Sequence, residues 1–434
     1  MRVFHVLTHF LPSQIAGTEL FVFALHSGLL ELGYEGGVII PDLQNQGDKE
    51  GFYQGVRVLK FRQRFEPNQN IISQPHKEDL DEFKAVLINE RPDLLHFHEI
   101  SGNRGVSMRH IEIASKLGIP FVITFHLVGY LCFSGTLIEG NKTLCDGTIG
   151  ITKCAACNLS HRRVSPVLAQ PLLWFSLILR RCKVKLYGRL GRVGTAVSMA
   201  EQIGLHQTRL NRLQDLSEKI IVPTNWYREM LMKNGFLESK INVITHGVFS
   251  TGQRIQTIQP RNDNSLKLLF IGRVHWSKGL LVLLKALAEV SRQDIKLDIF
   301  GPHYNDGYYR ECMDASALLV NVSWRGTIPA GETTSIMRHY DFLCVPSMVS
   351  ETGPMVALEA FSVNLPVIGS NVYGLNGLLA DEKFGFLFER GNHLQLADRL
   401  EHLDTGSKFM SSEIPIRSFK EVIRDHHELY RNLN

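Results

Sequence analysis

Short apolar segments alternate with segments of helical spacing along most of the chain, and this alternation restricts the possible folds more than any other feature. In the first half, residues 19–32 and 77–89 have helical spacing and lie between short apolar runs. Such alternation is typical of βαβ units, in which helices cover both faces of a parallel sheet. We expect strands at residues 3–8, 37–40, 56–61, 94–98, 121–125, 219–222 and 241–244.

A second α/β pattern begins after a polar stretch. Residues 251–265 are rich in Gln, Asn and Thr and are interpreted as an interdomain linker. Beyond them, strands are expected at 266–271, 296–300, 341–345 and 365–369, with helices at 279–289 and 351–362. The predicted fold class is α/β, with two doubly wound, Rossmann-like domains at residues 1–250 and 266–410. Residues 411–434 are expected to hold a closing amphipathic helix.

The charge balance and the first residues exclude several classes of protein. The 434 residues carry 47 Lys and Arg against 43 Asp and Glu, a net charge of +4, which argues against a nucleic-acid partner. The N-terminus lacks the long apolar region of a signal peptide, so we expect a cytoplasmic protein. Residues 164–179 form an uncharged run between basic residues, contain two prolines and are shorter than the ~20 residues of a spanning helix.

Two cations follow the strand expected at 266–271. The sequence continues Gly-Arg273-Val-His-Trp-Ser-Lys278-Gly before a helix. Glycine lets the backbone approach a ligand, and Arg and Lys beside a helix N-terminus suit a diphosphate. A solvated turn with two surface cations explains the pattern equally well. The chain contains no Walker motif.

Two glutamates mark the segment after the strand expected at 341–345. Glu351 lies at the approach to the next helix, and Glu359 lies within that helix among apolar neighbours. A carboxylate here can bind paired sugar hydroxyls, and the amides freed at the helix start can donate to a ligand. The structural alternatives are an acid favoured by the helix dipole for Glu351 and a solvated helix acid for Glu359. The second alternative is weaker, because a charge among apolar residues usually has a partner.

The first half offers weaker signals. Gly17 and Thr18, in the loop before the first helix, could present amides to a phosphate, although Thr18 could equally be an N-cap. Three histidines end expected strands. His126 is the candidate for a site, because it closes a strand directly before a loop, whereas His96 and His98 are interpreted as sheet packing.

These motifs, in this order, resemble the retaining glycosyltransferases of family four, also described as glycosyl transferases group 1. The resemblance rests on the Arg273/Lys278 pair, the spaced Glu351 and Glu359, and the glycine loop at Gly17, and it covers nearly the whole chain. It implies a GT-B fold, with two Rossmann-like domains facing across a cleft and a last helix that packs back on the N-terminal domain.

The resemblance also implies a reaction and its residues. A sugar would move from a UDP- or GDP-sugar to a glycan or lipid-linked acceptor, in polysaccharide or glycoconjugate synthesis, with retention of anomeric configuration and without a catalytic cofactor. Arg273 and Lys278 would stabilise the leaving diphosphate. Glu359 would bind the ribose, and Glu351 would hold the donor sugar. The remaining expected contacts are the backbone of Thr352, Gly353 and Met355 to the sugar, Gly17 to the phosphate, and His126 to the sugar or acceptor.

The chain departs from the family pattern at three places. Ala16-Gly17 replaces a double glycine, Thr352 and Gly353 stand where an aromatic is frequent, and Asn376 stands in a region where glutamate is frequent. These differences affect the donor more than the reaction class. Two other functions stay open: a nucleotide-sugar epimerase of similar build, and a non-catalytic glycan-binding protein.

Four of the seven cysteines lie in one short window. Cys132, Cys145, Cys154 and Cys157 end in a Cys-x-x-Cys pair, a spacing that favours a structural zinc site. Four reduced thiols are the alternative. We expect such a site to clamp a loop near the acceptor, with no part in the chemistry.

Residues 162–192 combine cations with a long apolar stretch that includes Trp174 and Phe175. An internal helix with solvated ends is the simpler interpretation. The alternative is peripheral contact with an anionic membrane surface at the inner face of the membrane. The cations of this segment are Arg162, Arg163, Arg180, Arg181, Lys183, Lys185, Arg189 and Arg192.

Overall fold

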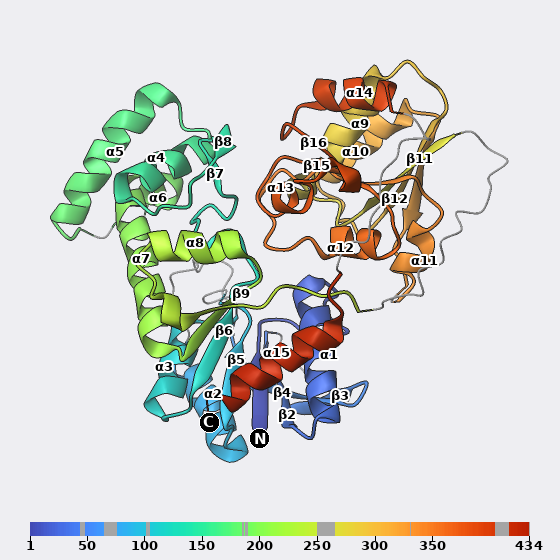
Figure 1. The fold of residues 1–434 in the computed structure, drawn as a ribbon. Coiled ribbons are helices and arrows are strands. Elements are labelled where there is room, and N and C mark those ends of the chain that lie inside the picture. Colours follow the sequence, from blue (N-terminus) through green and yellow to red (C-terminus); the bar gives the residue numbers. More distant parts are fainter. Residues whose placement is uncertain are drawn as a thin grey trace. The chain divides into compact units, whose positions relative to one another are not determined.

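The computed structural model describes residues 1–43, 48–64, 76–100, 105–184, 186, 190–249, 265–329, 331–403 and 416–433. The chain forms two compact units (Figure 1). The N-terminal unit comprises Met1–Thr245 and Val422–Asn434, and the C-terminal unit comprises His246–Glu421. The linker expected at 251–265 lies outside the described residues, apart from Ser265, which is buried.

An eight-stranded sheet forms the centre of the N-terminal unit, in the order β10-β9-β6-β5-β1-β2-β4-β3. Only the edge strand β3 pairs antiparallel. β5 and β6 are buried at every position, as continuous apolar runs in a doubly covered parallel sheet should be. The strands are β1 (Arg2–Val6), β2 (Glu35–Asp42), β3 (Glu50–Tyr53), β4 (Val56–Arg62), β5 (Leu94–Phe97), β6 (Phe121–Thr124), β9 (Lys219–Val222) and β10 (Ile241–Val243).

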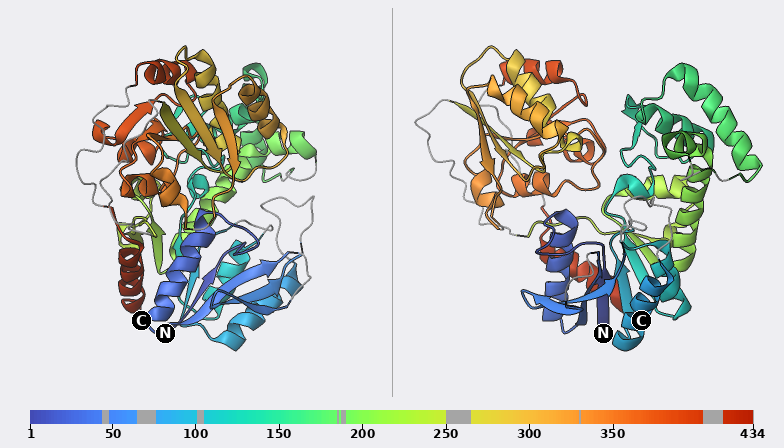
Figure 2. Two further views of the ribbon diagram at one scale, coloured as in Figure 1. Left: turned by 90° about the vertical axis from the view of Figure 1, so that its right-hand side faces the viewer. Right: turned by 180° about the vertical axis from the view of Figure 1, so that it is seen from behind.

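Helices cover both faces of this sheet. Figures 1 and 2 show α1 (Gly17–Glu31) and α15 (Phe419–Arg431) on one face, with α2 (Lys77–Glu90) and α3 (Met108–Lys116) on the other. α3 begins with a capping box in which Ser107 and His110 satisfy each other's backbone amides. α15 packs on α1, because Gly28 leaves room for the side chain of Ile423. The helix α8 (Asn225–Lys233) follows β9.

The segment between β6 and β9 is a helical insertion with a small core of its own. Leu159 of α4, Leu173 of α5 and Ile203 of α7 meet in this core. Figure 1 shows α5 at the outer edge of the unit, away from the sheet. The insertion contains η2 (Val128–Tyr130), β7 (Ile138–Glu139), β8 (Thr143–Leu144), α4 (Ile151–His161), α5 (Pro166–Arg181), α6 (Gly191–Val197) and α7 (Met199–Leu216).

The C-terminal unit is built on a six-stranded parallel sheet in the order β13-β12-β11-β14-β15-β16. Its core contains Leu268 and Phe270 of β11, Ile299 of β12 and Leu283 of α9. The strands are β11 (Leu266–Ile271), β12 (Ile295–Phe300), β13 (Val322–Gly326), β14 (Phe342–Val345), β15 (Val367–Ser370) and β16 (Gly385–Phe388). The helices are α9 (Leu280–Glu289), α10 (Gly307–Ala317), α11 (Thr333–Met337), α12 (Met355–Ser362), α13 (Leu375–Leu378) and α14 (His393–Glu401), with 3₁₀ turns η4 (Trp276–Lys278) and η5 (Glu382–Phe384). A further 3₁₀ turn, η3 (Glu238–Lys240), belongs to the N-terminal unit.

The expected alternation of strands and helices is confirmed in both units. One expectation was wrong in detail: the helix predicted from residue 351 begins at Met355. Pro354 disfavours helical backbone at Gly353 and is itself the extended N-cap of α12, so the helix begins after it. Among the described residues, no helix is long and apolar enough to cross a membrane.

Candidate functional site

The C-terminal sheet reverses its winding direction between β11 and β14. From β11 the chain continues outward to β12 and β13, then returns to place β14 on the other side of β11. In open α/β sheets, ligands bind outside the carboxyl ends of the strands at such a point. Arg273 and Lys278 follow β11, and Glu351 follows β14, so the sheet brings the two predicted motifs to this edge.

An ion pair joins the two motifs. Lys278 Nζ donates to Glu351 Oε1 at 2.7 Å, and Ser347 Oγ donates to the same oxygen at 2.6 Å. The Glu351 side chain is 12 % exposed, and that of Lys278 is 33 % exposed. Burial by itself would raise the pKa of Glu351, but the charge and hydrogen bond of Lys278 and the Ser347 hydroxyl lower it below the usual value. Glu351 is therefore a carboxylate, fixed in position beside a cation.

Two glycines allow the loops around this pair to touch. Gly279 has φ +71°, and a Cβ there would lie 1.8 Å from the carbonyl oxygen of Pro346. Gly374 has φ +94°, and a Cβ there would lie 2.0 Å from the carbonyl oxygen of Glu351. Only glycine fits both the left-handed backbone and these contacts. The main chain of Glu351 is held further by its amide, which donates to the carbonyl of Tyr373 at 2.9 Å.

Arg273 is close to Lys278 in the sequence but forms no hydrogen bond or ion pair with Lys278 or Glu351. The side chain of Arg273 is exposed, and within the described ranges it forms no ion pair. Its neighbour His275 caps the turn η4, where the imidazole Nδ1 and Ser277 Oγ share a hydrogen bond of 2.8 Å. Burial, then the charges of Arg273 and Lys278, lower the pKa of His275. A neutral His275 leaves two cations at the carboxyl end of β11: Lys278, which Glu351 holds in place, and the exposed Arg273.

Glu359 is a half-buried acid in the middle of α12. Burial raises its pKa to about 7. Its carboxyl group has neither a hydrogen-bond nor an ion-pair partner in the part of the chain that the structure describes. Burying a carboxylate without a partner is costly, so this group is suited to binding hydroxyl donors from a ligand.

The predicted backbone contacts lie between these two acids. Thr352 and Gly353 form the loop before α12, and Met355 is its first residue. A Cβ on Gly353 would lie 2.4 Å from His246 Cδ2, so the His246 ring packs directly against this backbone. The turn at His246 is one of the elements that resemble the family, but neither His246 nor Ser347 was predicted as a site residue. Ser347 could have been suspected, because it is a polar residue directly after a buried strand.

The other candidate residues belong to the N-terminal unit. His126 is 7 % exposed and lies two residues beyond β6. Its Nε2 shares a hydrogen bond of 2.9 Å with His98 Nδ1, and its ring packs edge-on against Phe21 of α1. The expectation that His98 is only a packing residue was therefore incomplete. His96 packs in the sheet and also shares hydrogen bonds with Tyr430 Oη at 2.6 Å and Thr124 Oγ1 at 2.7 Å.

Gly17 is the exposed first residue of α1. The N-cap is Ala16, without a side-chain hydrogen bond, so Thr18 is not the cap. The next residue after Thr18, Glu19, was not predicted as a site residue. Its side chain is 3 % exposed and accepts a hydrogen bond from Gln14 Nε2 at 2.6 Å. Burial raises the pKa of Glu19. The start of α1 therefore combines open backbone with a buried acid.

The four cysteines of the predicted zinc site are all free thiols in the helical insertion. Burial is the main cause that raises the pKa of Cys154, and the charges of the other three thiols raise it further. The four cysteine side chains therefore lie close together. However, no three of their sulfurs lie within 4.8 Å of one another; among the described residues that criterion is met by His5, His96 and His98. Cys157 Sγ instead donates to the carbonyl of Ile138 at 3.6 Å. The sulfurs as placed do not form a closed tetrahedral site, and zinc binding stays a prediction.

A family model, glycosyl transferases group 1, matches residues 253–411. The matched segment covers less than half of the chain. It contains the Lys278–Glu351 pair and Glu359.

Similar curated proteins are also glycosyltransferases. A D-inositol 3-phosphate glycosyltransferase of Paenarthrobacter aurescens is 28 % identical over 169 residues, which cover 38 % of this chain and 40 % of the relative. A lipopolysaccharide 1,2-N-acetylglucosaminetransferase of Salmonella typhimurium is 24 % identical and covers 42 % and 51 %. A UDP-Gal:alpha-D-GlcNAc-diphosphoundecaprenol alpha-1,3-galactosyltransferase of Escherichia coli is 28 % identical and covers 39 % and 47 %. The matches thus span about half the length of these relatives, or less.

Solved structures match over the whole chain. Sucrose-phosphate synthase of Thermosynechococcus elongatus has a TM-score of 0.66 at 15 % identity, covering 100 % of this chain and 98 % of that one. Anabaena HepE in complex with UDP and glucose has a TM-score of 0.61 at 13 % identity and covers both chains fully. These likenesses confirm the expected GT-B fold of two Rossmann-like domains.

Proposed function

We propose that this protein transfers a sugar from a nucleotide-diphosphate sugar to a glycan or lipid-linked acceptor, with retention of anomeric configuration. The observation that carries the proposal is the Lys278–Glu351 pair at the winding reversal of the C-terminal sheet, within the segment that matches the glycosyl transferases group 1 family. The names of the curated relatives support a transferase, and the UDP in the HepE structure supports a nucleotide-sugar donor.

The residues at this edge suit the departure of a nucleotide diphosphate. In the reaction, the bond between the anomeric carbon and the β-phosphate oxygen breaks, and the electron pair leaves with the diphosphate. An acceptor oxygen bonds to the same carbon and releases its proton. Negative charge therefore grows on the diphosphate, and Lys278 and Arg273 would stabilise it most in the transition state.

Glutamates would bind the two ends of the donor. Glu351 is ionised and rigid, so it can accept hydrogen bonds from sugar hydroxyls without reorganisation. Glu359 would accept from the paired ribose hydroxyls, which supply the partners that its carboxyl group lacks. The backbone of Thr352, Gly353 and Met355, with Gly17 and His126 in the N-terminal unit, completes the proposed contacts.

Nucleotide release tests this proposal. The full chain is incubated with UDP-, GDP- and ADP-sugars and a panel of glycan and lipid-linked acceptors. We expect acceptor-dependent release of one nucleoside diphosphate, together with a glycosylated product of retained configuration. Isomerised sugar with acceptor-independent nucleotide release would indicate an epimerase instead. Glycan binding with no turnover of any sugar nucleotide would indicate a non-catalytic binding protein.

A membrane surface is part of the proposal, because the outer face of α5 is apolar. Val167, Trp174 and Ile178 are 80 %, 62 % and 56 % exposed and form one stripe at helical spacing. The opposite face packs on the insertion through Leu173 and Ser176. Residues 162–192 contain eight Lys and Arg and no Asp or Glu. An apolar stripe in a segment whose charged residues are all basic suits an anionic lipid surface, where a lipid-linked acceptor would lie.

Vesicle binding tests the membrane contact. We expect the full chain to sediment with phosphatidylglycerol-containing vesicles, less with phosphatidylcholine vesicles, and less at high salt. Replacing Trp174 with Ser should weaken the binding several-fold. Phe52→Ser is the matched control, since Phe52 is an aromatic residue 71 % exposed on β3. Equal loss in both variants, or equal binding to both lipids, would contradict this part of the proposal.

A further inference from the structure

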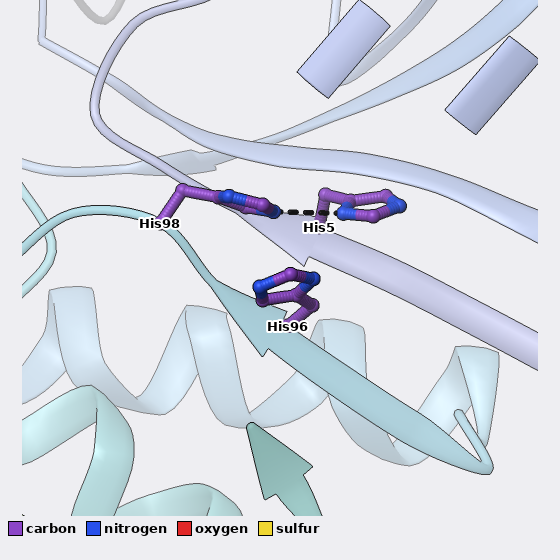
Figure 3. Close-up of side chains that lie close together, drawn as sticks. All are labelled: His5, His96 and His98. Atoms are coloured by element: carbon purple, nitrogen blue, oxygen red, sulfur yellow. Dashed lines mark hydrogen bonds between the residues drawn. The ribbon is translucent and has the colours of Figure 1, made fainter. Parts of the chain in front are cut away.

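Three histidines form a hydrogen-bonded chain on one face of the N-terminal sheet. His5 Nδ1 and His98 Nε2 are 2.8 Å apart, and His98 Nδ1 and His126 Nε2 are 2.9 Å apart. Figure 3 shows the bond between His5 and His98, with His96 directly beside it. We call His5, His98 and His126 the histidine chain.

The sheet topology explains why these residues meet. β1 and β5 are neighbours at the winding reversal of this sheet, with β2 and β4 on one side and β6 and β9 on the other. His5 pairs in register with His96, and His98 lies two residues further along, so all three share one face. The histidine chain therefore ends at the sheet edge where doubly wound domains place ligands.

Burial and the surrounding histidines favour neutral rings at His5, His96 and His98. Burial lowers the pKa values of His5, His96 and His98 well below the usual value, and the neighbouring histidines lower them further. Those neighbours are His26 of α1 and His426 of α15, while Thr124 of β6 and Tyr430 of α15 are bonded to His96. Each neutral ring has one N–H, so a 2.8 Å contact between two ring nitrogens requires a proton on one of them.

A single proton per ring makes the chain directional. If His98 donates through Nδ1 to His126, its Nε2 must accept from His5; if it donates through Nε2 to His5, its Nδ1 must accept from His126. The position of the proton on the His5 ring therefore determines which nitrogen of His126 is protonated. In the first direction His126 carries its proton on Nδ1, and in the second on Nε2.

The buried end of the chain distinguishes the two directions. His5 Nε2 is buried without a hydrogen-bond partner among the described residues. The second direction would place an N–H there, and an orphaned buried donor is rarer than an unsatisfied acceptor. The first direction leaves only a lone pair at that position. A metal ion at this place is disfavoured, because both nitrogens of His96 and both of His98 already have hydrogen-bond partners.

We propose that His5 and His98 are positioning residues that keep the proton of His126 on Nδ1. His126 then acts as a hydrogen-bond donor at Nδ1 and not as a general base. The assignment of the tautomer is independent of the proposed function, whereas its effect on catalysis rests on that proposed function. A donor at this position suits an oxygen of the sugar or of the acceptor, and the acceptor proton must leave by another route.

The tautomer can be measured without any activity. The full chain is labelled with ¹⁵N-histidine, and His126 is assigned from the spectrum of His126→Gln. We expect the nitrogen shifts and two-bond couplings of His126 to show Nδ1–H and a bare Nε2 at pH 7.5. A proton on Nε2 would overturn the proposal, and so would two bare nitrogens facing each other with a stoichiometric metal. If this result stands while no sugar is transferred, the proposed function fails and the tautomer assignment survives.

Two nearly isosteric substitutions test the coupling through the chain. His5→Asn can still donate to His98 and should keep kcat/KM within about twofold. His5→Asp can only accept when ionised, should reverse the direction, and should lower kcat/KM about tenfold. UDP or GDP binding should not change in either variant, because His5 does not belong to the C-terminal unit. Equal effects of both substitutions, with equal melting temperatures, would contradict the proposal.

Discussion

Both units contain a sheet that reverses its winding direction, but one unit places charged side chains at the reversal and the other places neutral ones. Each sheet reverses its winding direction beside its first strand, at β1/β5 and at β11/β14. The C-terminal unit places a full ion pair there, between Lys278 and Glu351, whereas the N-terminal unit places neutral imidazoles there. Burying a charged side chain without a partner is costly. Lys278 and Glu351 avoid this cost because they pair with each other, and both lie at the ends of strands of the same sheet. At the N-terminal sheet edge, hydrogen bonds between neutral imidazoles hold the side chains in place.

Removing the cation of the charged site should have the largest effect. We expect Lys278→Met to lower kcat by about 10²–10³-fold, as loss of a preorganised group that stabilises developing negative charge does. Lys285→Met is the control, because Lys285 is an exposed lysine of the adjacent helix α9. Steady-state rates with saturating donor check the prediction. Similar rates for the two variants would mean that the ion pair is structural.

Acid should destabilise the N-terminal unit before the C-terminal unit. Burial lowers the pKa of His26 to about 4, below the unfolded value of about 6.5, so the unfolded state binds more protons between those pH values. Stability is then complete above about pH 6.5 and falls as the pH drops toward 4, by up to about 1.4 kcal/mol per pH unit for each such histidine. His5, His96, His98, His110 and His206 shift in the same direction.

Hydrogen exchange with mass spectrometry can measure this difference. After correction for intrinsic rates, peptides of β1, β5 and β6 should lose protection between pH 7 and 5, while peptides of β11 and β14 change less. A uniform loss across both sheets would refute the contrast between the units.

Glu359 should make nucleotide binding depend on pH in the opposite unit. Its pKa is about 7, and hydroxyl donors bind the ionised form better, so affinity should rise as the pH increases through 7. We expect roughly tenfold tighter binding of UDP or GDP at pH 8 than at pH 6, with a proton released on binding, as about one pKa unit of coupling implies. Calorimetry in buffers of different ionisation enthalpy checks both. Glu359→Gln should abolish the pH dependence, and Glu289→Gln, an exposed acid of α9, should preserve it.

The cysteine group should have the smallest effect on the charged site. If the zinc prediction is correct, protein purified under reducing, chelator-free conditions contains one equivalent of metal, and Cys154→Ser loses it. Nucleotide binding should remain within about twofold, because Cys154 lies in the N-terminal unit. Absence of stoichiometric metal would show that the sulfurs are reduced thiols, as they are placed in the structure.

The sequence predicted those features that depend on local pattern. β11 occupies the expected residues 266–271, because its apolar run ends sharply at Gly272. β3 was not predicted, since its positions alternate between exposed and half-buried and give no apolar run. The proximity of Lys278 and Glu351 could be expected, because each lies after the end of a strand and both strands belong to one sheet. The histidine chain could not be predicted, because it depends on the register between His5 and His98, which are 93 residues apart.

The last helix has a consequence for the order in which the protein matures on the ribosome. α15 completes the N-terminal unit, where Tyr430 contacts His96 and His426 lies against the histidine chain. All strands of the C-terminal sheet are synthesised before this helix. The unit translated first is therefore finished last: its histidines stay uncovered on that side until residues 422–433 emerge. Termination of translation between residues 404 and 421 would leave the strands of the C-terminal sheet attached to an N-terminal unit that lacks its last helix.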